Sequence, residues 1–281
     1  MFGAAVLAVC LVGAVFAPWL APQNPFDPAQ INLLDAFTPP LWQPGGRWPF
    51  VLGTDDQGRD ILSTILYGMR ISLLVGLGAV ALAALLGVAL GLVAGFFGGL
   101  VDIAAMRLAD VQLTVPALLI ALFIDGLVRL WLPRDTGAIV ALSVLIVAIG
   151  LADWPHYARV VRSLAQIERG KDYVAAARLA GVGAPMILWR HILPNATGPV
   201  FVLGTLGLAL AIIIEATLSF LGVGMPPTQP SLGTLIRVGN EFLFSGEWWI
   251  TLFPSAALVL LVLSVNLVGD WLRDALNPRL R

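Results

Sequence analysis

Residues 71–101 read ISLLVGLGAVALAALLGVALGLVAGFFGGLV, a run of 31 residues without Asp, Glu, Lys or Arg. Arg70 and Asp102 bound it on either side. A helix needs about 20 apolar residues to cross the hydrocarbon core of a bilayer. The run therefore predicts a helix that spans a membrane.

The composition of the whole chain agrees with this prediction. Of 281 residues, 59% are hydrophobic and 12% are charged, whereas soluble domains carry roughly 25% charged residues. The formal net charge is −1, which provides no basic surface for a nucleic-acid partner. These values exclude a soluble enzyme, a disordered chain and a nucleic-acid-binding protein, and they favour an all-α membrane protein.

Apolar stretches with few or no charges give six predicted spans along the chain. They lie at about residues 1–20, 71–98, 111–132, 136–152, 197–221 and 248–268. The first has no basic residues before it, so a retained helix is favoured over a cleaved secretory signal. The third contains Asp125 and Arg129, which are spaced to pair on one helix face.

Three segments lie outside these spans. Placing both termini in the cytoplasm puts ten basic residues inside and six outside, as the positive-inside rule favours. We therefore expect residues 21–70 to form an extracytoplasmic loop, 153–195 a cytoplasmic loop and 269–281 a cytoplasmic tail. Asp153, at the predicted end of a span, is expected to be solvated.

Glycine recurs every four residues in the second predicted span, at Gly87, Gly91, Gly95 and Gly99. This spacing places the four on one face of a helix, where small residues let a second membrane helix approach closely. Tight helix packing is the favoured interpretation, and a direct role in a transport path is the alternative.

The chain lacks the residues for binding nucleotide or metal by itself. Its one lysine, Lys171, follows a glycine, but Ala165 and Asp172 stand where a phosphate-binding loop needs Gly and Ser or Thr. His156 and His191 lie far apart in the sequence, neither falls in a predicted span, and no metal-binding motif surrounds them. We expect no metal site and no cofactor, and a partner would have to bind any ATP.

Residues 171–195 read KDYVAAARLAGVGAPMILWRHILPN. Tyr173, Ala176, Ala177 and Ala180 fall on one helix face, and Gly181 follows as a helix breaker. A cytoplasmic helix–turn–helix with such a small face suits docking into a groove on another protein. A helix lying on the membrane surface is the alternative.

This stretch resembles the cytoplasmic E-A-A-x3-G-x9-I-x-L-P motif (the EAA motif) of ABC importer permeases. The positions that match are Ala176, Ala177, Gly181, Leu193 and Pro194. His191 replaces the motif isoleucine. Ala175 replaces the glutamate, so the resemblance implies a docking helix that lacks one anchoring carboxylate.

The resemblance covers nearly the whole chain and points to the C-type permeases of the dipeptide/oligopeptide/nickel branch. It rests on GTDDQGRD (53–60), ILYG (65–68), RISLLVG (70–76), GFFGG (95–99), MRLAD (106–110), EATLSFLG (215–222) and NLVGD (266–270).

The resemblance implies a type I ABC importer permease fold with six spans and cytoplasmic coupling helices, in the inner membrane of a bacterium. It implies import, and we expect the substrate to be a peptide. It also implies a homologous second permease, two ABC ATPases that bind ATP, an extracytoplasmic substrate-binding protein and surrounding lipid. The residues implied in ATPase coupling are Tyr173, Ala176, Ala177, Arg178, Gly181, Arg190, Leu193 and Pro194.

Two further sets of residues are candidates for function. Glu215 and Ser219 would line the translocation path, because a carboxylate within a span needs a partner or a water-filled cavity; a structural hydrogen bond is the alternative. The charged residues before the second span would contact the binding protein or, alternatively, form a turn and a helix cap. They are Asp55, Asp56, Arg59 and Asp60.

The sequence gives less support to two other classes of protein. An ion-gradient-driven secondary transporter would favour inverted repeats, and the sequence shows none. A membrane-embedded enzyme would need converging polar residues within the spans, and Glu215 stands nearly alone there.

Overall fold

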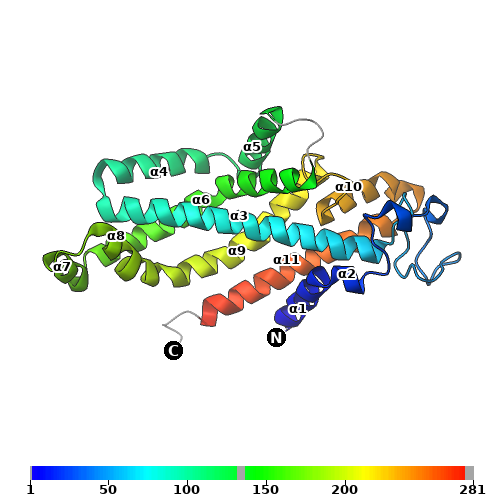
Figure 1. The fold of residues 1–281 in the computed structure, drawn as a ribbon, viewed down its shortest axis with the longest axis horizontal. Helices are drawn as coiled ribbons and strands as arrows, with labels where there is room; N and C mark the ends of the chain where they lie inside the picture. The colour runs from blue at the N-terminus through cyan, green and yellow to red at the C-terminus, as the bar shows by residue number, and fades with distance from the viewer. Residues whose placement is uncertain (1, 132–136, 276–281) are drawn as a thin grey trace.

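Four long helices run lengthwise through the protein (Figure 1). The computed structural model describes residues 2–131 and 137–275. The four helices are α3 (Ile61–Phe97), α6 (Ala138–Arg169), α9 (Leu193–Phe220) and α11 (Trp249–Ala275). Each belongs to a helix long and apolar enough to cross a membrane. The described residues form no β-strand, and the predicted all-α class is confirmed.

The two ends of the bundle differ (Figure 1). One end carries residues 21–60 and is called the loop end here. The other carries α7 (Asp172–Leu179) and α8 (Ala184–Ile187) and is called the α7 end. The chain continues from α8 through a π-helical turn, η3 (Leu188–Ile192), into α9, so that residues 184–220 form one continuous helix.

Helices α3 and α6 are in direct backbone contact. A Cβ atom added to Gly87, Gly91 or Gly95 would lie 2.5 to 2.6 Å from a backbone oxygen of α6, and real Cβ atoms do not pack so closely. The predicted tight packing is confirmed for these three glycines. Gly99 does not belong to the set, because it begins α4 with φ +58° and has open space around it.

Helix α3 begins ten residues earlier than predicted. The Asp60 carboxylate caps it by accepting a hydrogen bond from the Ser63 backbone N–H at 2.7 Å. Arg70 lies exposed on the helix surface, so its charge interrupts the apolar run without ending the helix. The non-helical loop therefore ends at residue 60 rather than 70.

The third predicted span, 111–132, is not a single helix. Helix α4 (Gly99–Leu113) and helix α5 (Ala117–Trp131) meet at an angle of 97°. Pro116 precedes α5, and proline cannot donate a helical hydrogen bond. The predicted end of this span at 132 and the start of the next at 136 lie outside the described residues.

The predicted pair on α5 forms as expected. Arg129 Nε donates to Asp125 Oδ2 at 2.6 Å. Its Nη2 also donates to the carbonyl oxygens of Val223 and Gly224, at 2.9 and 3.1 Å. The pair therefore fastens α5 to the turn that follows α9.

Helix α6 continues to Arg169, so the prediction of a loop from residue 153 is wrong for 153–169. Pro155 lies inside the helix and leaves the carbonyl of Leu151 without its usual donor. The Gln112 side chain of α4 donates to the carbonyls of Leu151 and Ala152 at 2.7 and 3.0 Å. Because Gln112 supplies the missing donor, α6 continues past Pro155 without a break.

Six predicted spans become four, or up to five if α4 and α5 are counted as one. Helix α1 (Phe2–Val15) has 14 residues, about 21 Å at 1.5 Å per residue, which is shorter than the hydrocarbon core. A second short helix, α2 (Ala17–Leu20), follows it. Residues 269–275 of the predicted tail belong to α11, and 276–281 lie outside the described residues.

The loop end is ordered by contacts with the helices. Residues 21–60 contain two short 3₁₀ turns, η1 (Pro28–Gln30) and η2 (Leu33–Asp35). Thr38 and Thr54 exchange hydrogen bonds, and Trp249 Nε1 of α11 donates to the Thr54 carbonyl at 3.1 Å. Helix α10 (Leu232–Phe242) and the turn η4 (Leu243–Ser245) complete this end.

Gly91→Ala should destabilise the protein by about 1–3 kcal/mol, because the new methyl group would overpack the α3–α6 contact. Gly126→Ala is the matched control, since Gly126 lies inside α5 with open space around it. That change should be neutral or stabilising by roughly 0.5–1 kcal/mol through helix propensity. Thermal unfolding of the purified protein in detergent measures both, and equal midpoints would contradict the packing argument.

Candidate coupling and translocation sites

Residues 172–192, called the α7–α8 segment here, are anchored to the bundle by apolar side chains. Val174, Ile187 and Ile192 are fully buried. They pack in one cluster with Leu92 and Phe96 from the end of α3. Displacing the segment would therefore displace the bundle as well.

A carboxylate that the sequence analysis missed joins three helices beneath this segment. Glu168, in the last turn of α6, accepts from Tyr173 Oη at 2.5 Å, Lys171 Nζ at 2.6 Å and Asn195 Nδ2 at 3.3 Å. Partial burial and the Glu168 carboxylate raise the pKa of Tyr173 to about 12, so the phenol remains a donor at neutral pH. Glu168 anchors α7 although Ala175 replaces the motif glutamate.

The turn after α7 is a Schellman motif. The Gly181 N–H donates to the Arg178 carbonyl, and the Val182 N–H donates to the Ala177 carbonyl, both at 3.0 Å. Gly181 has φ +78°, a conformation in which glycine carries no Cβ penalty. The predicted helix break at Gly181 is confirmed.

The outward surface of the α7–α8 segment combines small and large apolar residues. Leu179, Met186 and Trp189 are 92, 52 and 73% exposed, and apolar groups gathered on an exposed surface indicate an interaction site. Of the eight residues implied in coupling, Ala177 and Leu193 are half-buried. The other six are exposed; they are Tyr173, Ala176, Arg178, Gly181, Arg190 and Pro194.

Glu215 is completely buried near the loop end and satisfied by hydroxyl groups. Ser72 of α3 donates to one carboxylate oxygen at 2.8 Å, and Ser219 donates to the other at 2.7 Å. Ser231, which caps α10, donates to Ser219 at 3.1 Å. These bonds join α3, α9 and α10, which matches the structural alternative; Glu215 and Ser219 are both fully buried.

The charged residues of 53–60 mostly face inward. Asp55, Arg59 and Asp60 are at most 3% exposed, and Arg59 Nε donates to Asp55 Oδ2 at 2.6 Å. Burial raises the pKa of the Asp60 carboxyl, against the opposing effect of its bonds to Ser63. The predicted contact surface is therefore reduced to the half-exposed Asp56, and the turn-and-cap alternative describes the other three.

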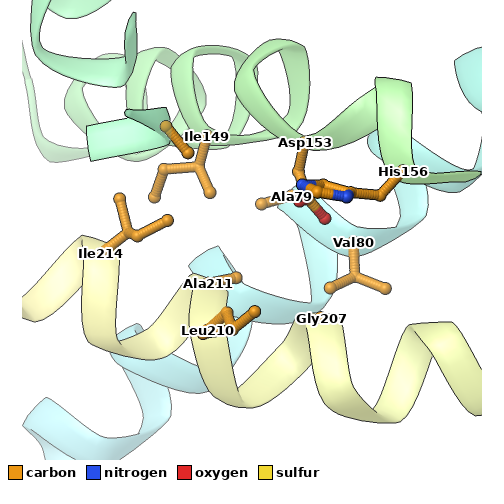
Figure 2. Close-up of a pocket in the computed structure, with 10 residues that line it drawn as sticks. Ala79, Val80, Ile149, Asp153, His156, Gly207, Leu210, Ala211 and Ile214 are labelled. Carbon is orange, nitrogen blue, oxygen red and sulfur yellow. Dashed lines mark ion pairs between the residues drawn. The ribbon is translucent and has the colours of Figure 1, made fainter. Parts of the chain in front are cut away.

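A cavity of about 130 Å³ lies among α3, α5, α6 and α9. Figure 2 shows Asp153 and His156 of α6 at this cavity, beside apolar residues of α3 and α9. Asp153 is thus not at the end of a span, as predicted, but halfway along a helix. The error follows from the misplaced end of α6, which also hid His156 from the predicted spans.

The chain is similar to known transport proteins. Residues 87–281 match the family described as binding-protein-dependent transport system inner membrane component. The chain is 43% identical to the dipeptide transport system permease protein DppC of Escherichia coli over 279 residues, 99% of this chain and 88% of that protein. The corresponding DppC of Haemophilus influenzae is 39% identical over 276 residues, 98% and 88% of the two chains.

A di/tripeptide transport system permease protein of Pseudomonas aeruginosa is 39% identical over 268 residues, 95% of this chain and 84% of that protein. Among solved structures, a chain of the inward-facing MetNI methionine ABC transporter aligns with a TM-score of 0.53 at 17% identity, covering 76% of this chain and 94% of that one. A chain of an amino acid ABC transporter aligns with a TM-score of 0.54 at 16% identity, covering 75% and 94%. These likenesses confirm the predicted permease fold.

Glu215→Gln should leave stability and transport close to those of the original protein, since an amide can still bond to Ser72 and Ser219. Glu215→Leu should lose about 1–3 kcal/mol, because it leaves buried hydroxyls without partners. Thermal unfolding and peptide uptake are measured for both. A Gln variant that is stable but does not transport would instead assign Glu215 a charge-dependent role in the path.

Proposed function

Because the chain belongs to the family of binding-protein-dependent transport system inner membrane components, we propose that it forms half of the path of an ATP-driven importer of di- and oligopeptides. The peptide substrate is supported by three relatives, from separate organisms, whose names specify dipeptide or di/tripeptide transport. Family membership favours this function over an ion-gradient-driven carrier.

The partners follow from the same family. A binding-protein-dependent importer comprises a partner permease, an ATPase and a substrate-binding protein. We assign the other half of the path to a homologous permease and ATP binding to two ABC ATPases, since this sequence has no phosphate-binding loop. The chain itself would need no cofactor.

The α7–α8 segment is the proposed contact with an ATPase. Its small and apolar outer residues are exposed, while Val174, Ile187 and Ile192 hold it to the ends of α3, α6 and α9. A force applied at the exposed surface would therefore move these helices as a unit. Such a lever suits a bundle that changes between two packings.

The proposed orientation places both termini and the α7 end in the cytoplasm. The loop end would then face the binding protein, which could meet Asp56 and the exposed loop residues around it. This orientation puts ten of the sixteen basic residues on the cytoplasmic side, in agreement with the positive-inside rule. It also places the α7–α8 segment where cytoplasmic ATPases can reach it.

The test is peptide uptake by the transporter reconstituted into proteoliposomes with its ATPases and binding protein. Gly181→Asp should reduce ATP-dependent uptake at least tenfold and weaken co-purification of the ATPase, because it puts a charge on the exposed turn. No heavy atom lies within 4 Å of the Cβ position at Gly181, so the new side chain would meet no other atom of this chain. The φ of +78° would strain the backbone, and the control variant below carries the same strain.

Gly222→Asp provides the matched control at the opposite end of the protein. Gly222 ends α9 in an equivalent Schellman turn, with φ +85° and equally open surroundings. The ATPase should co-purify normally with this variant. Equal behaviour of the two variants would contradict coupling through the α7–α8 segment, and original protein without ATP-dependent uptake would contradict the importer function.

A further inference from the structure

The cavity among α3, α5, α6 and α9 has apolar walls and one polar corner. Most of the described residues that line it are aliphatic or glycine, among them Val80 of α3 and Leu210 and Ile214 of α9. Asp153 and His156 are the ionisable side chains in this lining, and Figure 2 shows them next to each other at one side of the cavity. The cavity therefore combines a surface for apolar groups with a site for charge.

Asp153 has a carboxylate without a hydrogen-bond donor among the described residues. The basic side chain beside it is His156, whose Nε2 lies 3.8 Å from Oδ1, beyond hydrogen-bond distance. The Asp153 side chain is 21% exposed and that of His156 is 55% exposed. Glu215, by contrast, is fully buried with a hydroxyl on each oxygen. Asp153 therefore has acceptor capacity that the residues described in the structure do not fill.

The site lies at mid-depth in the bundle. Asp153 is halfway along α6, and Gly207, which faces it, is halfway along α9. A Cβ atom at Gly207 would lie 2.6 Å from Tyr157 Oη and 3.6 Å from Asp153 Oδ2. Because Gly207 has no side chain, α9 can approach α6 without covering the Asp153 carboxylate. Ionisable residues at this depth usually mark a substrate or ion pathway.

We propose that Asp153 and His156 form a subsite of the translocation path that receives a primary ammonium group, as at the amino terminus of a peptide. The inference rests on the proposed function and specifies the chemistry of its path. An ammonium is compact and carries three donors, so it can approach the carboxylate to a charge-assisted hydrogen bond of about 2.8 Å. The ammonium would approach Asp153 more closely than His156 Nε2 does, and His156 would stay beside it in the cavity lining. At about 130 Å³, the cavity admits the end of a peptide rather than a whole one.

The first experiment measures uptake of radiolabelled alanyl-alanine by the reconstituted transporter at saturating loaded binding protein. Asp153→Asn should lower the maximal rate at least tenfold, while binding-protein-stimulated ATP hydrolysis stays within twofold of the original. Asp110→Asn is the matched control, because Asp110 is a half-exposed carboxylate paired with Arg159 at 2.5 Å and does not line the cavity. This control should transport normally.

A second measurement does not depend on a substitution at Asp153. Cys10, the one cysteine of the sequence, is changed to Ser, and Leu210→Cys places a thiol at the cavity. Labelling by the neutral reagent N-ethylmaleimide is then timed with different peptides present. Alanyl-alanine should slow labelling at least threefold and N-acetyl-alanyl-alanine should not. N-acetyl-alanyl-lysine shows whether a side-chain ammonium is also accepted.

The outcomes separate the subsite from the function on which it rests. Uptake by Asp153→Asn at the original rate, equal protection by free and acetylated dialanine, or no protection by any peptide would each overturn the ammonium subsite. If Asp153→Asn fails to assemble, the labelling result decides. An original transporter without ATP-dependent peptide uptake would contradict the proposed function instead.

Discussion

The contact between α3 and α6 is the constraint on which the other features depend. Three glycines of α3 bring the two backbones together, and van der Waals packing of this kind is a main source of helix association in lipid. Because α6 is fixed along α3, its last turn carries Glu168 to α7 and its midpoint carries Asp153 to the cavity. The α7–α8 segment and the cavity are thus positioned by the same helix pair, and a shift of α6 would affect both.

Polar groups among apolar helices need partners, and most of those described here have them. Glu215 is bound by Ser72 and Ser219, and Asp125 by Arg129. Such bonds connect segments distant in the sequence, so they help to select one packing of helices whose surfaces are otherwise uniformly apolar. Asp153 differs because its best partner lies beyond hydrogen-bond distance. Asp153 is therefore available to a ligand, whereas Glu215 and Asp125 hold helices together.

Pro116, inside the predicted third span, and Pro155, just after the predicted fourth, show why the sequence predicted some helices and not others. Pro116 separates α4 from α5, whereas Pro155 lies within a continuous α6. Neither proline has a backbone N–H to donate to the carbonyl four residues earlier. Gln112, more than 30 residues before Pro155, binds the carbonyl that this proline leaves free. A count of charges and prolines along the chain cannot include a partner from another helix.

Arg70 and Asp153 lie inside helices, although the charge of each predicts a helix end. Arg70 lies on the exposed surface of α3, and Asp153 faces a cavity. Each can occupy a helix interior because its surroundings accommodate the charge. Four of the six predicted runs coincide with long apolar helices, since about 20 such residues have few alternatives to a membrane helix. The helix ends were less predictable because caps and neighbouring helices decide them.

The sequence by itself determined the membrane class, the glycine face of α3, the helix break at Gly181 and the family resemblance. These features depend on composition or on spacings of a few residues, which local geometry converts directly into structure. The tertiary structure alone decided that Glu215 and Arg59 are buried and bonded, that Glu168 anchors α7, and that Asp153 borders a cavity. Burial and pairing depend on which helix faces meet, and residues far apart in the chain determine those contacts.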